Sequence, residues 1–288
     1  MPSIISVIVI TYNRPDALIA VIEACFAQDD QAFEIVIADD GSSHATRQAV
    51  AALQARSPVP LRYVWQQDLG FRAARARNLG TLNAQGDYIV FIDGDCIPQR
   101  NFVSRHRKLA QRGHLVQGSR ILLSESATSE VLRRRLDLQA LTAADKFAWR
   151  GRGAVNKLLP LLLTWPDVGR TSRRFTWRRI KSCNLAVWRS DLELVNGFDE
   201  SFVGWGHEDA DLVMRLFNAG VMRKDGAYAT EVFHLWHEES DRNRESGNRA
   251  LVMRRAVDRT VSADYGLRQN VGAGELSAAA SPRQAAAA

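Results

Sequence analysis

The sequence predicts an α/β fold in which helices cover both faces of a mostly parallel central sheet. Over the first hundred residues, stretches typical of strands alternate with stretches typical of helices, as in parallel sheets with crossover helices. The run from Tyr88 to Ile92 is apolar throughout, as expected of a strand buried on both faces. Acidic residues directly follow two of the strands, and open α/β sheets bind ligands at the carboxyl ends of strands.

The predicted elements follow one another in a regular order. Residues Ile4–Ile10 form the first strand, and Pro15, a residue favoured in the first turn of a helix, opens a helix that runs to Phe26. Next come a strand at 33–38, a helix ending near residue 55, a strand at 61–65 and a helix at 73–84. The last strand of this half ends at Asp93. The first apolar stretch lacks a basic leader, so we interpret it as a strand and not as a signal peptide.

Composition is that of an ordinary globular protein. Of its 288 residues, 46% are hydrophobic and 24% are charged. No stretch reaches the roughly 18 consecutive apolar residues that a membrane span requires. Cys25, Cys96 and Cys183 are widely spaced and show no metal or disulfide pattern, so we expect a reducing, cytoplasmic location.

Charge is distributed unevenly along the chain, whose net charge is +6. Residues 100–181 carry nineteen Lys or Arg and five Asp or Glu, which leaves the remainder net acidic. Such a segment indicates an anionic partner: phosphate, an acidic glycan, nucleic acid or an anionic lipid surface. Its basic and apolar parts are Arg133–Arg135, Leu158–Trp165, Arg173, Arg174, Arg178 and Arg179. It is either a solvated helical insertion with its own small core or an interfacial element resting on anionic lipid.

Two acidic motifs mark the predicted ligand-binding edge of the sheet. Asp93 and Asp95 flank Gly94 directly after the buried strand and project the same way from extended backbone. Asp95, past the flexible glycine, is better placed to bind a metal, whereas Asp93 can reach a ribose hydroxyl or the metal's water. Asp39 follows another strand and can accept hydrogen bonds from a base or a ribose. The alternative for Asp39 is an Asx turn that caps the next helix.

A further acidic cluster lies about a hundred residues later. Glu208 and Asp209 precede a predicted helix, and acids in a first turn complement the helix dipole. That role does not explain the two glycines around Trp205, whose indole we interpret as a stacking platform for a sugar ring. His234 and His237 follow a predicted strand at 230–233, and imidazole nitrogens together with carboxylates indicate a divalent cation. The combination points to chemistry on a phosphorylated substrate.

These motifs, in this order, resemble glycosyltransferase family 2, whose members have the GT-A fold, a Rossmann-like fold of nucleotide-diphospho-sugar transferases. The amino-terminal half carries the resemblance at residues 7–14, 39–42, 76–80 and 93–95. The carboxyl-terminal half resembles a galactosyltransferase-type region at residues 181–186, 197–200 and 204–209. The resemblance covers roughly residues 3–240.

The resemblance implies three groups of functional residues. The nucleotide-sugar would be held by Thr11, Tyr12, Asp39, Arg77, Asp93 and Trp205. The metal, Mn²⁺ or Mg²⁺, would be bound by Asp95, His237 and His234. Asp209 would be the catalytic base, and Glu208 would contact the acceptor or the donor sugar.

The implied activity is the inverting, metal-dependent transfer of a hexose from a UDP-sugar to a glycan or lipid-linked acceptor. The sugar would be of the galactose, glucose or N-acetylhexosamine type, and the product a cell-surface polysaccharide or lipopolysaccharide. A nucleotidyltransferase is the main alternative, but the glycine-rich basic loop that it needs after the first strand is absent. The other alternative is a protein that binds nucleic acid through the basic segment. The aromatic residues in that segment do not form the alternating pattern on which bases stack, so we expect no nucleic acid partner.

The resemblance also suggests how the chain is organised. We predict one domain over residues 1–260, with a nucleotide-binding half (1–100) and an acceptor and catalytic half (101–240). The second half contains the basic helical insertion, residues 120–180, in which Pro160 prevents one regular helix. Residues 261–288 are predicted to be a disordered tail, because from Gly272 the chain is almost all Ala, Gly, Ser and Pro. The location would be cytoplasmic, at the inner face of the cell membrane if the insertion is interfacial.

Overall fold

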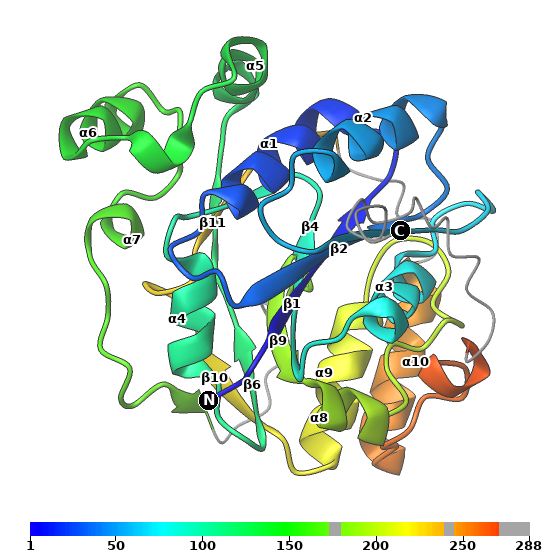
Figure 1. The fold of residues 1–288 in the computed structure, drawn as a ribbon. Coiled ribbons are helices and arrows are strands. Elements are labelled where there is room, and N and C mark those ends of the chain that lie inside the picture. The colour runs from blue at the N-terminus through cyan, green and yellow to red at the C-terminus, as the bar shows by residue number, and fades with distance from the viewer. Residues whose placement is uncertain (173–179, 239–244, 271–288) are drawn as a thin grey trace, which may run out of the picture.

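The computed structural model describes residues 1–172, 180–238 and 245–270, and its centre is an eight-stranded sheet with the order β3-β2-β1-β4-β9-β6-β10-β8 (Figure 1). β1 (Ile5–Thr11) lies between β2 (Phe33–Asp39) and β4 (Tyr88–Asp93) and is parallel to both. β3 (Leu61–Trp65) continues the parallel half beyond β2. This half of the sheet is the one that the sequence predicted.

The other half of the sheet is mixed in direction. β9 (Asn184–Trp188) is antiparallel to β4 and to β6 (His114–Gln117). β10 (Met222–Asp225) is parallel to β6, and β8 (Thr171–Ser172) is antiparallel to β10. A separate small sheet has the order β5-β11-β7, and its strands are β5 (Cys96–Pro98), β11 (Val232–His234) and β7 (Arg120–Leu122).

Helices cover both faces of the large sheet, as predicted (Figure 1). Alternation along the strands divides the core, because Val7 and Val9 face one layer and Ile8 faces the other. The first layer contains α1 (Pro15–Phe26), α2 (His44–Gln54) and α4 (Phe102–Leu109). The second contains α3 (Ala73–Asn83), α8 (Arg189–Leu194) and α9 (Glu208–Asn218). α10 (Glu245–Asp258) packs on α9 through Val252.

The insertion between β7 and β8 is helical and lies to one side of the sheet (Figure 1). Its elements are α5 (Glu125–Arg134), η1 (Leu138–Ala140), α6 (Ala143–Gly151) and α7 (Leu159–Leu162). Pro160 lies at the start of the four-residue α7, so the expectation that Leu158–Trp165 is not one regular helix is confirmed. The idea that the insertion has its own small core is wrong. Val131 and Trp149 are buried in the same cluster as the first helical layer, because the insertion packs back onto that layer.

Part of the predicted tail is folded. η2 (Leu267–Asn270) follows α10, and Leu267 is only 5% exposed because it joins the core below α3. The Leu267 amide also donates to the carbonyl of Asn196 at 3.1 Å. The predicted start of the tail, residue 261, was wrong. The low-complexity composition begins only at Gly272, after Leu267, the last apolar residue of the core. Residues 271–288 lie outside the described part, as do Arg173, Arg174, Arg178 and Arg179.

Two expectations drawn from composition agree with the structure. All three cysteines are free and buried, so none forms a disulfide bond. Within the described residues, no helix is both long enough and apolar enough to cross a membrane.

Candidate active site

Three neighbouring parallel strands bring predicted site residues to one edge of the sheet. β1 ends at Thr11, which is in register with Asp39 at the end of β2. On the other side of β1, Ile10 is in register with Asp93, the last residue of β4. The strand ends that the apolar pattern predicted therefore meet, which is why residues far apart in the chain form one site.

Asp39 is held in place by its own turn. One carboxylate oxygen accepts the amides of Gly41 at 3.1 Å and Ser42 at 2.7 Å, and the other accepts the Tyr63 hydroxyl at 2.7 Å. The Asx turn that we considered as an alternative is therefore present, and Asp39 is 1% exposed. Burial and the Asp39 hydrogen bond raise the pKa of Tyr63, so its hydroxyl stays a donor. A ligand would have to share an oxygen that already has partners.

Thr11 and Tyr12 stand beside this turn. The Thr11 hydroxyl is buried and has no hydrogen-bond partner within the described residues, so it is available to a bound molecule. The Tyr12 ring is half exposed, and its hydroxyl donates to Asp68 at 2.9 Å. Asp68 in turn covers Gly41, where any side chain would collide with the Asp68 backbone at 2.5 Å. The turn after β2 is thus closed by the loop that precedes α3.

Gly94 allows the backbone to pack closely against β1, and it does not provide the flexibility that we expected. Its amide donates to the Ile10 carbonyl at 2.6 Å, and a Cβ would lie 2.7 Å from that same oxygen. The backbone between Asp93 and Asp95 is therefore fixed against β1. Asp95 directly precedes β5 of the small sheet, and its carboxylate lies near two histidines at the end of that sheet.

Asp95, His234 and His237 form one cluster. In the small sheet, His234 is in register with Cys96, and the Leu235 amide donates to the Asp95 carbonyl at 2.9 Å. His234 Nε2 lies 3.8 Å from Asp95 Oδ1, and His237 Nε2 lies 3.5 Å from Asp95 Oδ2. One ligand atom from each of the three residues lies within 4.8 Å of the others. The structure therefore brings together the three residues that the sequence suggested as metal ligands.

The chemistry of this cluster suits a divalent cation. It offers one carboxylate and two imidazoles, a donor set of hard and borderline atoms. Burial lowers the pKa of His234, which keeps its imidazole neutral and able to ligate at neutral pH. His234 lies at the end of β11 and not on the following loop as expected, so its backbone is held between the neighbouring strands β5 and β7.

Arg14 also contacts this cluster, and the sequence reasoning assigned it no role. It precedes α1, and its Nη1 lies 3.5 Å from Asp95 Oδ2. A charged residue directly after the first strand, at the same edge as the acids, is the signal that could have identified it.

Arg77 connects the amino-terminal half of the chain to the carboxyl-terminal half. Its guanidinium donates to Asp93 at 3.2 Å and to Glu208 at 3.0 Å, and it lies 5.3 Å from the ring centroid of Phe198. Arg77 is 3% exposed, whereas the Arg75 side chain is 25% exposed and donates to Gln66, so the two arginines occupy different sides of α3 as their spacing requires. The direct partners of Arg77 in this structure are therefore carboxylates.

Glu208 and Asp209 differ in environment although they are neighbours at the start of α9. Glu208 is 7% exposed and paired with Arg77, whereas Asp209 is half-buried and accepts the amides of Ser182 at 3.2 Å and Ala210 at 2.7 Å. Burial and the adjacent Glu208 charge raise the pKa of Asp209 to about 7, against the opposing effect of Arg77. A carboxylate with a pKa near neutrality is suited to exchange a proton.

Trp205 lies on a strained loop before α9. Gly204 and Gly206 have φ angles of +81° and +101°, and His207, which precedes the helix, has φ +72°. The Gly204 amide donates to the Phe71 carbonyl at 3.1 Å, so this loop contacts the one that closes the Asp39 turn. The left-handed backbone explains the two glycines around the indole, and Trp205 is only partly buried.

Asn78 shows that some motif residues hold the framework together. Its side chain donates to the Phe198 carbonyl at 2.8 Å and accepts the Phe198 amide at 2.9 Å. A second donor contact reaches Glu200 at 2.8 Å. The segment 76–80 is thus tied to the segment 197–200, which positions Arg77 above Phe198.

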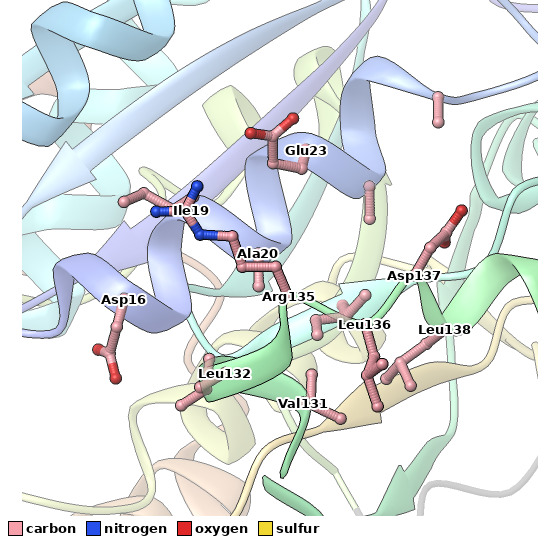
Figure 2. A pocket seen from close by; sticks show the side chains of 13 residues that line it. Asp16, Ile19, Ala20, Glu23, Val131, Leu132, Arg135, Leu136, Asp137 and Leu138 are labelled. Carbon is pink, nitrogen blue, oxygen red and sulfur yellow. The ribbon is translucent and has the colours of Figure 1, made fainter. Parts of the chain in front are cut away.

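A cavity of about 500 Å³ lies elsewhere, between α1 and the end of α5 (Figure 2). Ile19 and Ala20 of α1 face Leu132 and Leu136 across it, and Arg135 extends over it. None of the predicted site residues lines this cavity. The converging carboxylates and histidines, and not the cavity, define the candidate site.

Loss of the Arg77 side chain is expected to destabilise the fold. Arg77→Gln leaves the buried Glu208 carboxylate unpaired, and breaking a buried ion pair costs about 3–5 kcal/mol of unfolding free energy. Arg75→Gln is the matched control. Arg75 is partly exposed, its contacts are a hydrogen bond to Gln66 at 2.8 Å and a long ion pair with Glu200 at 3.7 Å, and its loss should cost about 1 kcal/mol. Urea denaturation measures the unfolding free energy of both variants. Equal losses would contradict the claim that the buried Arg77–Glu208 pair stabilises the fold.

Family models match both halves of the chain. The model described as Glycosyl transferase family 2 matches residues 6–174, and that described as N-terminal domain of galactosyltransferase matches residues 168–238. A validoxylamine A glucosyltransferase from Streptomyces hygroscopicus subsp. limoneus is 30% identical over 226 residues, which are 76% of this chain and 49% of that protein. A hyaluronan synthase from Pasteurella multocida is 28% identical over 285 residues, 88% of this chain and 27% of that protein. The chain thus spans at most about half the length of these relatives.

Solved structures share the fold. The mannosyltransferase PcManGT from Pyrobaculum calidifontis, in complex with GDP-Man and Mn²⁺, has a TM-score of 0.58 at 18% identity, covering 89% of this chain and 64% of that one. TarS of S. aureus (residues 1–349) has a TM-score of 0.56 at 14% identity, covering 92% and 67%. These matches confirm the predicted GT-A fold. With a family model over more than half of its length, the chain belongs to glycosyl transferase family 2 and is a glycosyltransferase domain.

Proposed function

We propose that this protein is an inverting, metal-dependent hexosyltransferase that uses a UDP-sugar. The observation that carries the proposal is the placement of two clusters at one edge of the sheet, Asp95 with His234 and His237, and Asp209 beside Glu208. Arg77 lies between them, because it contacts Glu208 of the second cluster and Asp93, which is two residues before Asp95 of the first. The first cluster suits a metal–diphosphate, and the second suits proton transfer.

The donor would lie along the ends of β1, β2 and β4. Thr11, with its unpartnered buried hydroxyl, would contact the base together with Tyr12 and Asp39. Asp93 would accept from the ribose, and Trp205 would stack on a sugar ring. Asp95, His234 and His237 would hold Mn²⁺ or Mg²⁺, which would neutralise charge on the leaving diphosphate.

The acid–base step would belong to Asp209. As the acceptor hydroxyl attacks the anomeric carbon, its proton passes to the Asp209 carboxylate, while the diphosphate leaves from the opposite face. Glu208 is less suited to this role, because its carboxylate is already engaged in a buried ion pair with Arg77 at 3.0 Å. A single base on that side gives inversion, so an α-linked nucleotide sugar yields a β-glycoside.

The proposal is tested by measuring UDP release from a panel of UDP-sugars. With Mn²⁺ present, hydrolysis of one of the glucose, galactose or N-acetylhexosamine donors should exceed that of the others. EDTA should remove the activity, and added Mn²⁺ should restore it. Absence of UDP release from every donor, with metal and with added glycan acceptors, would contradict the proposal.

The proposed acceptor is a glycan or a lipid-linked glycan used in cell-surface polysaccharide or lipopolysaccharide synthesis. The enzyme would bind this acceptor at the anionic inner face of the membrane. The insertion supports this location, because Leu159, Leu163 and Trp165 are 55%, 58% and 61% exposed. Arg133–Arg135 are exposed at the end of α5. An insertion that exposes leucine and tryptophan as well as arginine side chains has the composition of an interfacial element.

Binding to anionic vesicles is therefore expected, and it should weaken with salt. Each basic residue near the surface contributes about 1 kcal/mol. Reversing Arg133, Arg134 and Arg135 to Glu should abolish co-sedimentation with vesicles that contain an anionic lipid. The matched control reverses three exposed arginines at the other end of the chain, Arg254, Arg259 and Arg268, and should keep binding. Absence of binding at low salt would assign the segment to a soluble acceptor or to packing.

A further inference from the structure

Arg14 lies where a metal and a diphosphate would meet. Its Nη1 is 3.5 Å from Asp95 Oδ2, and His237 Nε2 is 3.5 Å from that same oxygen. The guanidinium and the proposed metal would therefore draw on one carboxylate oxygen. Because both are cations, they cannot share it without repulsion unless an anion is added.

The contact between Arg14 and Asp95 is loose. Charge-assisted hydrogen bonds are about 2.7–2.9 Å long, and this pair is longer. Arg14 Nη1 is buried and makes no hydrogen bond of good geometry to any described residue. A buried donor without a partner carries a free-energy cost that a suitable acceptor would remove. The side chain is 31% exposed, so it has room to turn.

The backbone of Arg14 is held on both sides. Its carbonyl accepts the Leu18 amide at 3.0 Å, which begins α1, and Pro15 follows directly. The neighbouring Asn13 has φ +49° and donates its amide to Ser42 at 2.8 Å, beside the Asp39 turn. The guanidinium thus extends from a fixed backbone position beside the turn that would bind the nucleotide, and it lies near Asp95.

We propose that Arg14 makes metal binding and nucleotide-diphosphate binding cooperative. In the empty site the guanidinium neutralises Asp95 and disfavours a lone divalent ion. When a diphosphate arrives with the metal, its oxygens accept from Arg14, and Asp95 is released to the metal. This inference rests on the proposed function, because it requires the metal at Asp95 and the diphosphate beside it.

The test is direct measurement of Mn²⁺ binding by electron paramagnetic resonance, with and without UDP. Wild-type protein should bind Mn²⁺ weakly alone and more tightly with UDP, within the roughly 5–150-fold range usual for coupled sites. Arg14→Gln should bind Mn²⁺ alone at least about fivefold more tightly, and the gain from UDP should shrink by a similar factor. Arg56→Gln, which removes the same charge from an exposed pair with Glu23, should behave like wild type.

The possible results are distinguishable. If Arg14→Gln binds Mn²⁺ alone as the wild type does or more weakly, and keeps the full gain from UDP, the coupling role is wrong while the metal site stands. If wild-type protein binds no Mn²⁺ even with saturating UDP, the proposed metal site fails, and the role of Arg14 fails with it. Asp95→Ala should bind no Mn²⁺ in either condition, which shows that the signal reports this site.

Discussion

Replacing Asp209 with asparagine is expected to lower the turnover number about 10²–10⁴-fold, the usual contribution of acid–base catalysis. Asparagine keeps the shape of the side chain and can still accept the Ser182 amide, so UDP binding should persist. Steady-state UDP release and UDP titration measure the two effects. Glu208→Gln is the comparison: if it is inactive while Asp209→Asn stays near the wild-type rate, the other carboxylate is the base.

The pH dependence of the reaction should report the same residue. Burial and Glu208 raise the pKa of Asp209 to about 7, so below that pH the carboxyl keeps its proton and cannot accept another. The rate should therefore rise with pH through about 7 and level off above it. The rising limb should be absent from the residual activity of Asp209→Asn, and a wild-type profile that is flat from pH 5 to 8 would contradict the assignment.

Asp95→Ala is expected to abolish metal-dependent transfer while the fold stays intact. It removes the charged member of the proposed ligand set, and neutral imidazoles alone bind a hard cation poorly. The control is Asp87→Ala, which removes an acid directly before β4, at the other end of the same strand. Activity assays with added Mn²⁺ and thermal denaturation compare the two variants. Full activity of Asp95→Ala would show that the metal site is elsewhere.

The strands with a clear apolar pattern in the sequence were predicted correctly. β1, β2 and β4 are buried on both faces, and these predominantly apolar strands end within about one residue of the predicted points. β11 was placed less well, because it has only three residues and its pairing with β5 and β7 depends on distant segments. The same limit applies to η2, whose single apolar anchor, Leu267, is followed at once by low-complexity sequence.

The candidate site was predictable where residues follow strand ends. Asp39, Asp93 and Asp95 meet because parallel strands end at one edge of the sheet. The pairing of Arg77 with Glu208 spans 131 positions, and no local pattern reports such a contact. The hydrogen bonds between the Asn78 side chain and the Phe198 backbone could not be predicted for the same reason. Arg14 was included in the segment 7–14 that carries the family resemblance but was given no role of its own. Its contact with Asp95 depends on the close packing of Gly94 against β1, which no local pattern reports.

Anomalous diffraction from crystals grown with UDP and Mn²⁺ tests the central claim most directly. The claim is that the edge formed by β4 and β11 holds the metal that serves the nucleotide diphosphate. It predicts a manganese peak bounded by Asp95, His234 and His237, in contact with the diphosphate of UDP. A peak away from these residues, or bound UDP with no metal peak near Asp95, would contradict it.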